Sequence, residues 1–199
     1  MKQKITQVLV RGGLLIINDE KFIQRAEIIR EKGTNRSLFF RGMVDKYSWV
    51  DIGSSYLMND VSAAYLWGNL EKADEINENR LATWQKYYDG LKELEVKGLI
   101  ELPIIPEGCA QNAHMFYIKV KDLKERTALL EHLKENNINA VFHYVPLHTA
   151  PAGLKFGRFD GVDEFTTVES ERLIRLPMYY GIEVLQIEFI CKTIKSFYN

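Results

Sequence analysis

The sequence predicts an α+β fold in which one long helix accompanies a small sheet with helices on one face. Between residues 59 and 94, apolar side chains recur at three- and four-residue steps, which is the spacing of an amphipathic helix. Two short apolar runs, residues 115–120 and 138–144, predict strands, and residues 123–135 between them have helical spacing. Residues 184–198 predict a closing amphipathic helix.

The segments before the long helix are assigned from their end signals. Residues 14–18 form a short apolar run before Asn-Asp and predict a buried strand. Asp19 can cap a helix over residues 20–31, with Gly33 as its stop. Residues 34–58 have no clean period and predict a long loop, and long loops in compact domains are usually functional or disordered.

Two segments late in the chain are assigned from their turn residues. Residues 151–161 are rich in glycine and predict a loop. Thr167 can cap a short helix over residues 167–175, which Pro177 follows. We find no internal repeat and no low-complexity tract.

The composition describes an ordinary globular chain without a strong charge. Of 199 residues, 46% are hydrophobic and 27% are charged, and the net charge is -1, so no global attraction to nucleic acid or to an anionic membrane is expected. Cys109 and Cys191 match no metal spacing and are interpreted as reduced thiols. The first residues do not resemble a signal peptide, and we expect a cytoplasmic protein without a membrane span.

A set of ordered motifs carries a resemblance to a known family. The motifs are REKGTNRS (residues 30–37), DIGSSYLM (51–58), AAYLW (63–67), QNAHMFYIK (111–119), FHYVPLH (142–148) and ESERLIRLP (169–177). With them the chain resembles the sugar aminotransferases of the DegT/DnrJ/EryC1/StrS family from about Gly12 to its end. Six motifs in order make the resemblance specific at the level of the family.

The resemblance implies the C-terminal small domain of a fold-type I transferase that depends on pyridoxal phosphate (PLP). On this interpretation residues 1–33 are a remnant of the large PLP-binding domain and residues 34–199 are the small domain. In the family, the N-terminal half carries the Schiff-base lysine and the acid that pairs with the pyridine nitrogen. We therefore assign no catalytic residue here and expect that this chain binds no PLP covalently.

Residues 1–12 have a separate interpretation. One choice of codons for them, read one base earlier, spells H-E-T-K-N-Y-T-S-A-G-E-G, which resembles the family's Schiff-base lysine segment. We hypothesise that the chain begins out of frame and regains the family's frame near Gly12. Lys4 is then not the catalytic lysine.

Ser55 is the candidate for binding the cofactor. In many relatives the matching segment reads G-x-N-Y-R-M, and its asparagine, supplied by the neighbouring subunit, contacts the PLP phosphate. Here Ser55 holds the asparagine position and Leu57 the arginine position. A serine hydroxyl can donate to a phosphate oxygen. The alternative is that Ser54 and Ser55 only end the loop before the helix.

Two arginines are candidates for binding the substrate. By resemblance, Arg36 and Arg41 lie in a loop near the dimer interface and the mouth of the active site. A guanidinium suits a diphosphate because it bonds two oxygens at once, and a nucleotide sugar supplies a diphosphate. The alternative for each is a solvated surface arginine.

The motif FHYVPLH supplies three further substrate candidates. By resemblance His143, Tyr144 and His148 face the substrate cleft, where they can hydrogen-bond sugar hydroxyls or phosphate. The alternative is a structural histidine beside a proline turn. We expect no metal site, because no third ligand lies near the two histidines and the family uses none.

Two functions remain open at this stage. The resemblance implies an enzyme that moves an amino group, typically from glutamate, to C4 of a dTDP-keto-deoxysugar for polysaccharide assembly. The expected partners are a nucleotide sugar and a second copy of the chain. The alternative is a non-catalytic module of α+β fold that dimerises or binds a ligand.

Overall fold

The computed structural model describes residues 15–199, which fall into two compact units. Unit 1 ends at Lys72, and unit 2 comprises Ala73–Asn199. The predicted boundary after residue 33 lies inside unit 1, and the assignment of residues 1–33 to a large domain stays a prediction. In the part of the chain that the structure describes, no helix is both long and apolar enough to cross a membrane.

The strand predicted over residues 14–18 is absent from the described residues 15–18. Leu15 and Ile16 are each 73% exposed there. A strand needs a neighbour to satisfy its backbone groups, and an apolar run alone does not supply one. Leu14 and the hypothetical out-of-frame residues 1–12 lie outside the described residues.

The first predicted helix is confirmed. It begins as the 3-10 turn η1 (Glu20–Phe22) and continues as α2 (Ile23–Arg30). The Asp19 side chain accepts a hydrogen bond from the backbone N–H of Lys21 at 3.1 Å, which caps this end. Gly33 follows the helix with a φ of 77°, a conformation that favours glycine.

The segment after Gly33 is folded back on α2 and contains a short helix, α3 (Arg36–Phe40). The Gly33 N–H donates to the carbonyl of Ile28 at 2.8 Å, and the Gly33 carbonyl accepts from Val50 at 2.8 Å. A Cβ on Gly33 would lie 1.7 Å from the carbonyl oxygen of Asp51. This close approach requires glycine and fixes the path of the predicted loop.

The single long helix predicted over residues 59–94 is wrong in one respect, because the structure contains two helices. They are α4 (Asp60–Leu70) and α5 (Ala73–Val96). At the break, the Lys72 N–H bonds to the Asn69 carbonyl at 3.2 Å, a spacing of three residues that tightens and ends the last turn. The apolar spacing continues across this break, so the break is not visible in the sequence pattern.

Unit 2 contains a three-stranded antiparallel sheet in the order β1-β3-β2. The outer strands, β1 (Phe116–Lys119) and β2 (Val141–Phe142), lie within the two predicted runs, although β2 is much shorter than residues 138–144. The middle strand, β3 (Leu173–Leu176), was not predicted.

The helix predicted over residues 167–175 is therefore wrong over its last three residues. The helix α8 (Thr166–Arg172) ends at Arg172, and β3 follows without a loop. Exposure alternates along β3, with Ile174 and Leu176 buried and Leu173 and Arg175 half-buried. Pairing with strands on both sides stabilises this extended backbone, and such pairing is not visible in a four-residue pattern.

The predicted glycine-rich loop at residues 151–161 is also partly wrong, because it contains the helix α7 (Pro151–Phe156). Pro151 occupies the start of this helix, where its missing N–H costs nothing. A Cβ on Gly153 would lie 1.6 Å from the carbonyl oxygen of Leu147. Here glycine permits close packing and does not mark a flexible loop.

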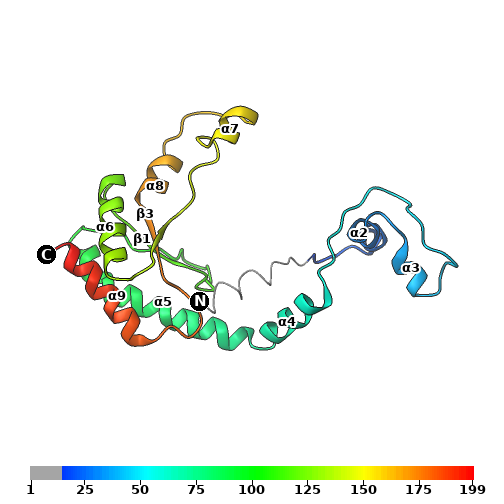
Figure 1. Cartoon of the computed structure of the whole chain (residues 1–199), viewed down its shortest axis with the longest axis horizontal. Helices are drawn as coiled ribbons and strands as arrows, with labels where there is room; N and C mark the ends of the chain where they lie inside the picture. Colours follow the sequence, from blue (N-terminus) through cyan, green and yellow to red (C-terminus); the bar gives the residue numbers. More distant parts are fainter. Residues whose placement is uncertain (1–14) are drawn as a thin grey trace. The chain divides into compact units, whose positions relative to one another are not determined.

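The core of unit 2 lies between one face of the sheet and three helices (Figure 1). The helices are α5, α6 (Leu123–Glu135) and α9 (Val184–Phe197), and the last two match their predictions closely. The largest fully buried side chains are Tyr87, Phe116, Leu91, Ile118, Leu129, Leu133, Ile174, Ile194 and Val120. The Tyr87 hydroxyl donates to the carbonyl of Pro177 at 2.8 Å, and burial raises the pKa of Tyr87.

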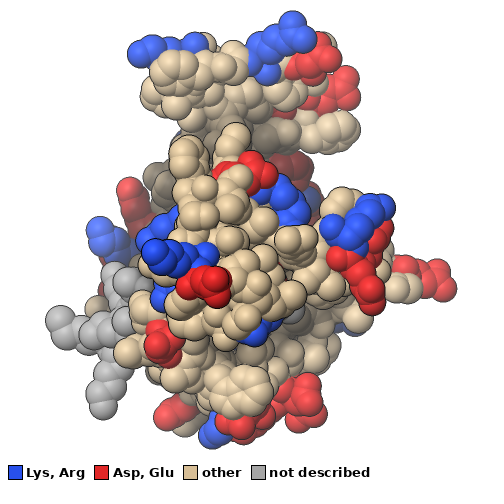
Figure 2. Space-filling model, turned by 90° about the vertical axis from the view of Figure 1, so that its right-hand side faces the viewer, with Lys and Arg blue, Asp and Glu red and all other residues tan. Residues whose placement is uncertain are grey.

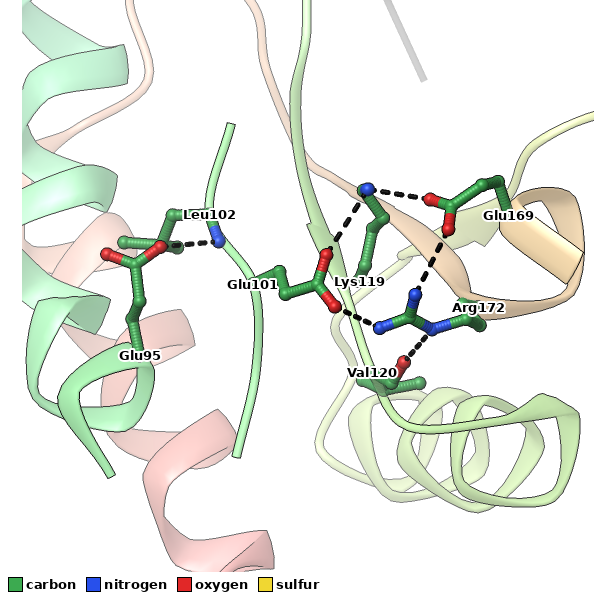
Figure 3. Close-up of polar contacts among 7 residues, drawn as sticks. All are labelled: Glu95, Glu101, Leu102, Lys119, Val120, Glu169 and Arg172. Atoms are coloured by element: carbon green, nitrogen blue, oxygen red, sulfur yellow. Dashed lines mark hydrogen bonds and ion pairs between the residues drawn. The ribbon is translucent and has the colours of Figure 1, made fainter. Parts of the chain in front are cut away.

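The other face of the sheet carries an ion network (Figure 3). Lys119 on β1 lies 2.6 Å from Glu169 and 3.3 Å from Glu101, and Arg172 pairs with the same two carboxylates. The Arg172 guanidinium holds the pKa of Glu101 below its usual value, and Glu169 raises the pKa of Lys119. Exposed pairs contribute only about 0.2–1 kcal/mol each, so the core is the larger source of stability.

Replacement of Ile174 by alanine should strongly destabilise unit 2. Ile174 is fully buried on the middle strand, and the change removes apolar burial and leaves a cavity. We expect a loss of about 2–5 kcal/mol in the free energy of unfolding, measured by urea titration. The control is Leu185→Ala on α9, where the side chain is 74% exposed. Equal losses in the two variants would contradict this account of the core.

Candidate functional site

One group of polar side chains in unit 2 gathers beside β3. Arg175 on β3 is directly opposite Val141 on β2, so both side chains point to the same face of the sheet. Continued alternation places His143, two residues after Val141, on that face as well. This face is opposite to the one that Ile174 and Leu176 bury in the core. The sheet register therefore brings Arg175 to the FHYVPLH segment.

Arg175, His143 and Tyr144 form the candidate site. The Arg175 Cζ lies 5.9 Å from the centre of the Tyr144 ring, and the centres of the His143 and Tyr144 rings are 4.8 Å apart. The Nε of Arg175 and the Nδ1 of His143 are both buried, and neither has a hydrogen-bond partner among the described residues. Tyr144 is 74% exposed, so the group opens to solvent on its side.

The electrostatics of this group are positive. Burial lowers the pKa of His143, and the nearby charges of Arg175 and His114 lower it further. In the part of the chain that the structure describes, Arg175 has no carboxylate within ion-pair distance. The site thus holds a fixed positive charge beside an imidazole whose pKa is lowered by burial and by that charge.

His148 is held elsewhere in unit 2. Its Nε2 lies 2.7 Å from an oxygen of Asp163, and its ring centre lies 4.4 Å from that of Phe159. Asp163 also accepts hydrogen bonds from the backbone N–H groups of Thr166 and Thr167. The hydrogen bond from the Thr167 hydroxyl holds the pKa of Asp163 below its usual value, and the contact with His148 lowers it by a smaller amount. His148 is thereby tied to the start of α8.

The three candidates in unit 1 have different local partners. Ser55 is exposed and forms an isolated bridge with Glu31. Arg36 lies over the ring of Phe40 at 5.0 Å. The roles of Ser55 and Arg36 stay predictions.

Arg41 already has a carboxylate partner. Its Nη1 donates to Oε2 of Glu27 at 3.2 Å, and its Nη2 donates to Oε1 of the same side chain. This pair occupies two donors that a diphosphate would use. The role predicted for Arg41 therefore requires that Glu27 be displaced.

Sequence reasoning missed Arg175 and Asp163. Arg175 lies within the ESERLIRLP motif, where the sequence predicted the end of a helix. Asp163 lies just after the glycine-rich residues 151–161. The signal that could have found Arg175 is the short apolar run at residues 173–176, interrupted only by this arginine, directly before Pro177.

The described residues fit PLP only in part. Ser55 offers one hydroxyl, which fits a contact to one phosphate oxygen. A lysine amine and an acid must meet at the ring of this cofactor, and the resemblance assigns both to the N-terminal half of the family's enzymes. We derive no chemical step through PLP from this chain alone.

The other reactive side chains do not form a second site of this kind. Among residues 15–199, no group of three or more His, Cys, Asp or Glu side chains is placed to hold a metal ion. Cys109 is exposed and Cys191 is buried, and both are free thiols. Burial raises the pKa of Cys191 to about 11, which disfavours its thiolate.

Comparison with known proteins identifies the family. The family model described as "DegT/DnrJ/EryC1/StrS aminotransferase family" matches residues 3–195. The chain is 30% identical over 177 residues to an uncharacterized protein of Methanocaldococcus jannaschii, covering 84% of this chain and 45% of that protein. It is 26% identical over 172 residues to the dTDP-3-amino-3,4,6-trideoxy-alpha-D-glucose transaminase of Micromonospora megalomicea, covering 84% of this chain and 42% of the relative.

A solved structure has the same fold. The aminotransferase TlmJ from Streptoalloteichus hindustanus superimposes with a TM-score of 0.75 at 19% identity, over 90% of this chain and 45% of that chain. The protein therefore belongs to the DegT/DnrJ/EryC1/StrS aminotransferase family, whose members are PLP-dependent, and it has an α+β fold. The chain spans less than half the length of these relatives.

Asp163 should support the start of α8 in a way that depends on pH. Asp163→Ala removes the oxygens that accept from Thr166 and Thr167, whereas Asp163→Asn keeps one acceptor. The folded pKa lies below 3.8, so the ionised carboxylate stabilises the fold above that pH, and this is lost as the pH falls through the folded pKa. We expect alanine to lower Tm more than asparagine at neutral pH.

Thermal unfolding followed by circular dichroism measures this effect over a range of pH. The deficits of both variants relative to the wild type should shrink in acid, since the wild-type carboxylate is then protonated. Thr149→Ala, which removes an exposed hydroxyl that bonds only to the carbonyl of Pro146, is a control outside this contact. Deficits that are constant with pH would show that the charge of Asp163 contributes nothing.

Proposed function

We propose that this chain is the C-terminal portion of a PLP-dependent nucleotide-sugar aminotransferase. The match of the family model to residues 3–195 carries the proposal, together with the coverage of only 45% of the curated relative. The function of the transaminase from Micromonospora megalomicea supports a dTDP-sugar as the substrate class. The protein acts in the cytoplasm, in the assembly of surface polysaccharide.

The finer assignment follows the motifs of the sequence. The intact enzyme converts dTDP-4-keto-6-deoxyglucose to its 4-amino sugar, as a dTDP-4-amino-4,6-dideoxygalactose transaminase does, with glutamate as the amino donor. PLP, when bound, would supply the electron sink that transfer of the amino group from the donor to the keto sugar requires. The residues of this chain bind and orient: Ser55 contacts the phosphate of PLP, and Arg36, Arg41, His143, Tyr144 and His148 contact the nucleotide sugar.

The chain alone should have no transaminase activity. By resemblance the Schiff-base lysine belongs to the family's N-terminal half, so we expect that PLP finds no amine here to bond covalently in the manner of the family. We expect no PLP absorbance band that borohydride fixes to the protein, and no turnover of glutamate with dTDP-4-keto-6-deoxyglucose. PLP absorbance that stays with the protein after borohydride reduction, together with turnover, would contradict this prediction.

The matched control is the same chain joined to the transaminase-like half that we expect upstream of Met1 in a neighbouring frame. The joined protein should show both the band and the turnover, and replacement of its Schiff-base lysine by alanine should remove both. A joined, folded protein that shows neither contradicts the proposed function. The absence of such an upstream frame contradicts the hypothesis for residues 1–12.

A second function is supported by the surface of unit 1. The helices α2, α3 and α4 contain no buried residue. Large apolar side chains of this unit are exposed, among them Trp49 (76%), Ile52 (78%), Tyr56 (70%), Val61 (79%) and Trp67 (65%). Exposed apolar area on this scale is typical of an association surface. This favours a chain that forms a homo-oligomer through unit 1, with or without catalysis.

Self-association should therefore depend on unit 1. Val61→Asp on α4 places a charge on this surface, and we expect it to weaken dimerisation at least about tenfold because the charge would be desolvated at the interface. The control is Val162→Asp in unit 2, where the valine is 82% exposed. Sedimentation equilibrium measures both. A wild-type chain that stays monomeric, or equal weakening by both changes, would rule out this surface.

A further inference from the structure

The unpaired donors beside β3 call for a ligand. A buried N–H without a partner loses its hydrogen bond to water and costs about 1–3 kcal/mol, so folded proteins rarely leave one unpaired. Two such nitrogens belong to neighbouring segments of one small sheet, the Nε of Arg175 on β3 and the Nδ1 of His143 directly after β2. Both atoms can donate, His143 when its proton is on Nδ1.

The charge of the surroundings selects the kind of ligand. Burial lowers the pKa of His143, and the charge of Arg175, which has no carboxylate within ion-pair distance among the described residues, lowers it further. Arg172, three residues before Arg175, is by contrast saturated by Glu101, Glu169 and the carbonyl of Val120 (Figure 3). Lys119 is paired in the same network. The sheet thus carries one neutralised cation cluster and one cation that still needs an anion.

The geometry of the guanidinium narrows the ligand further. A free Nε lets an arginine present Nε–H and one Nη–H side by side, and this edge matches two oxygens of a carboxylate or a phosphoryl group. The Tyr144 ring lies against the guanidinium and the imidazole, so it limits their movement. Tyr144 itself is exposed, which leaves a path from solvent.

We propose that Arg175 and His143 form an oxyanion-binding site on the sheet of unit 2, with Arg175 as its anchor. The shared chemistry is a group with at least two anionic oxygens, taken side-on by Arg175 while His143 donates a third hydrogen bond. The site itself rests on the contacts above. Its natural ligand, the donor's carboxylate or a phosphoryl group of the nucleotide sugar, rests on the proposed function.

Titration of the full chain with anions tests the site directly. The chain has four histidines, whose imidazole resonances can be followed by NMR, with His143→Asn used to assign the resonance of His143. Glutamate probes the carboxylate source, and dTDP and inorganic phosphate probe the phosphoryl source. We expect the His143 resonance to shift with saturation, while that of His132, held by the Thr193 carbonyl and the Ser196 hydroxyl, stays in place.

Variants test the anchor. Arg175→Gln should weaken binding about tenfold or more, since it removes a charged two-oxygen contact. Arg175→Lys should recover part of the affinity, because lysine keeps the positive charge but lacks the two parallel N–H donors of the guanidinium. The control Arg158→Gln removes the same charge from an exposed arginine of unit 2 and should change the affinity by less than about twofold.

Each outcome decides the proposal. Saturable binding of glutamate alone assigns a carboxylate site, and saturable binding of dTDP and phosphate alone assigns a phosphoryl site. If no anion shifts the His143 resonance of the folded wild-type chain, the proposal is overturned, and this holds even if the Arg175 variants fail to fold. Equal affinities of the Arg175→Gln and Arg158→Gln variants overturn Arg175 as the anchor.

The two proposals fail separately. Turnover by the joined enzyme with unchanged KM values after Arg175→Gln would remove the donor and the nucleotide sugar as ligands of this site and leave the aminotransferase. Anion binding by the chain without turnover by the joined enzyme would remove the aminotransferase and leave the site.

Discussion

The position of β3 between β1 and β2 is the constraint on which unit 2 depends. Its backbone pairs on both edges, so it is the element that makes two separate strands into one sheet. Its alternation then divides the side chains between two environments. Ile174 and Leu176 enter the core with α5, α6 and α9, whereas Arg175 points to the opposite face. One four-residue strand therefore sets both the packing and the placement of the candidate site.

Polar interactions arrange the second face of the sheet without dominating its stability. The network of Lys119, Arg172, Glu101 and Glu169 joins β1 to α8, directly before β3 begins (Figure 3). Such half-exposed pairs add little free energy compared with the buried side chains. Elsewhere charges of both signs are interspersed on the surface, as Figure 2 shows for one side, in agreement with the small net charge.

Unit 1 is stabilised differently from unit 2. Its segments are held together by close backbone contacts and not by a buried core. Gly33 approaches Asp51 and Gly53 more closely than any side chain would permit, and main-chain hydrogen bonds tie the loop to α2. Two of the motifs that carry the family resemblance, REKGTNRS and DIGSSYLM, meet on this scaffold. Its apolar side chains remain exposed, and exposed apolar area of this kind is typical of an interaction surface.

The sequence by itself determined the family, the α+β class and the helices at residues 20–30, 123–135 and 184–197. Asp122 and Asn59 accept from backbone N–H groups at 2.9 Å, and α6 has the bounds that its pattern predicts. These signals are local, because caps and apolar spacing act within a few residues. Only the tertiary structure decided the break before α5, the helix at Gly153 and the strand β3. The strand depends on contacts with residues distant in sequence, and for that reason Arg175 was hidden until Val141 and Tyr117 were placed on either side of it.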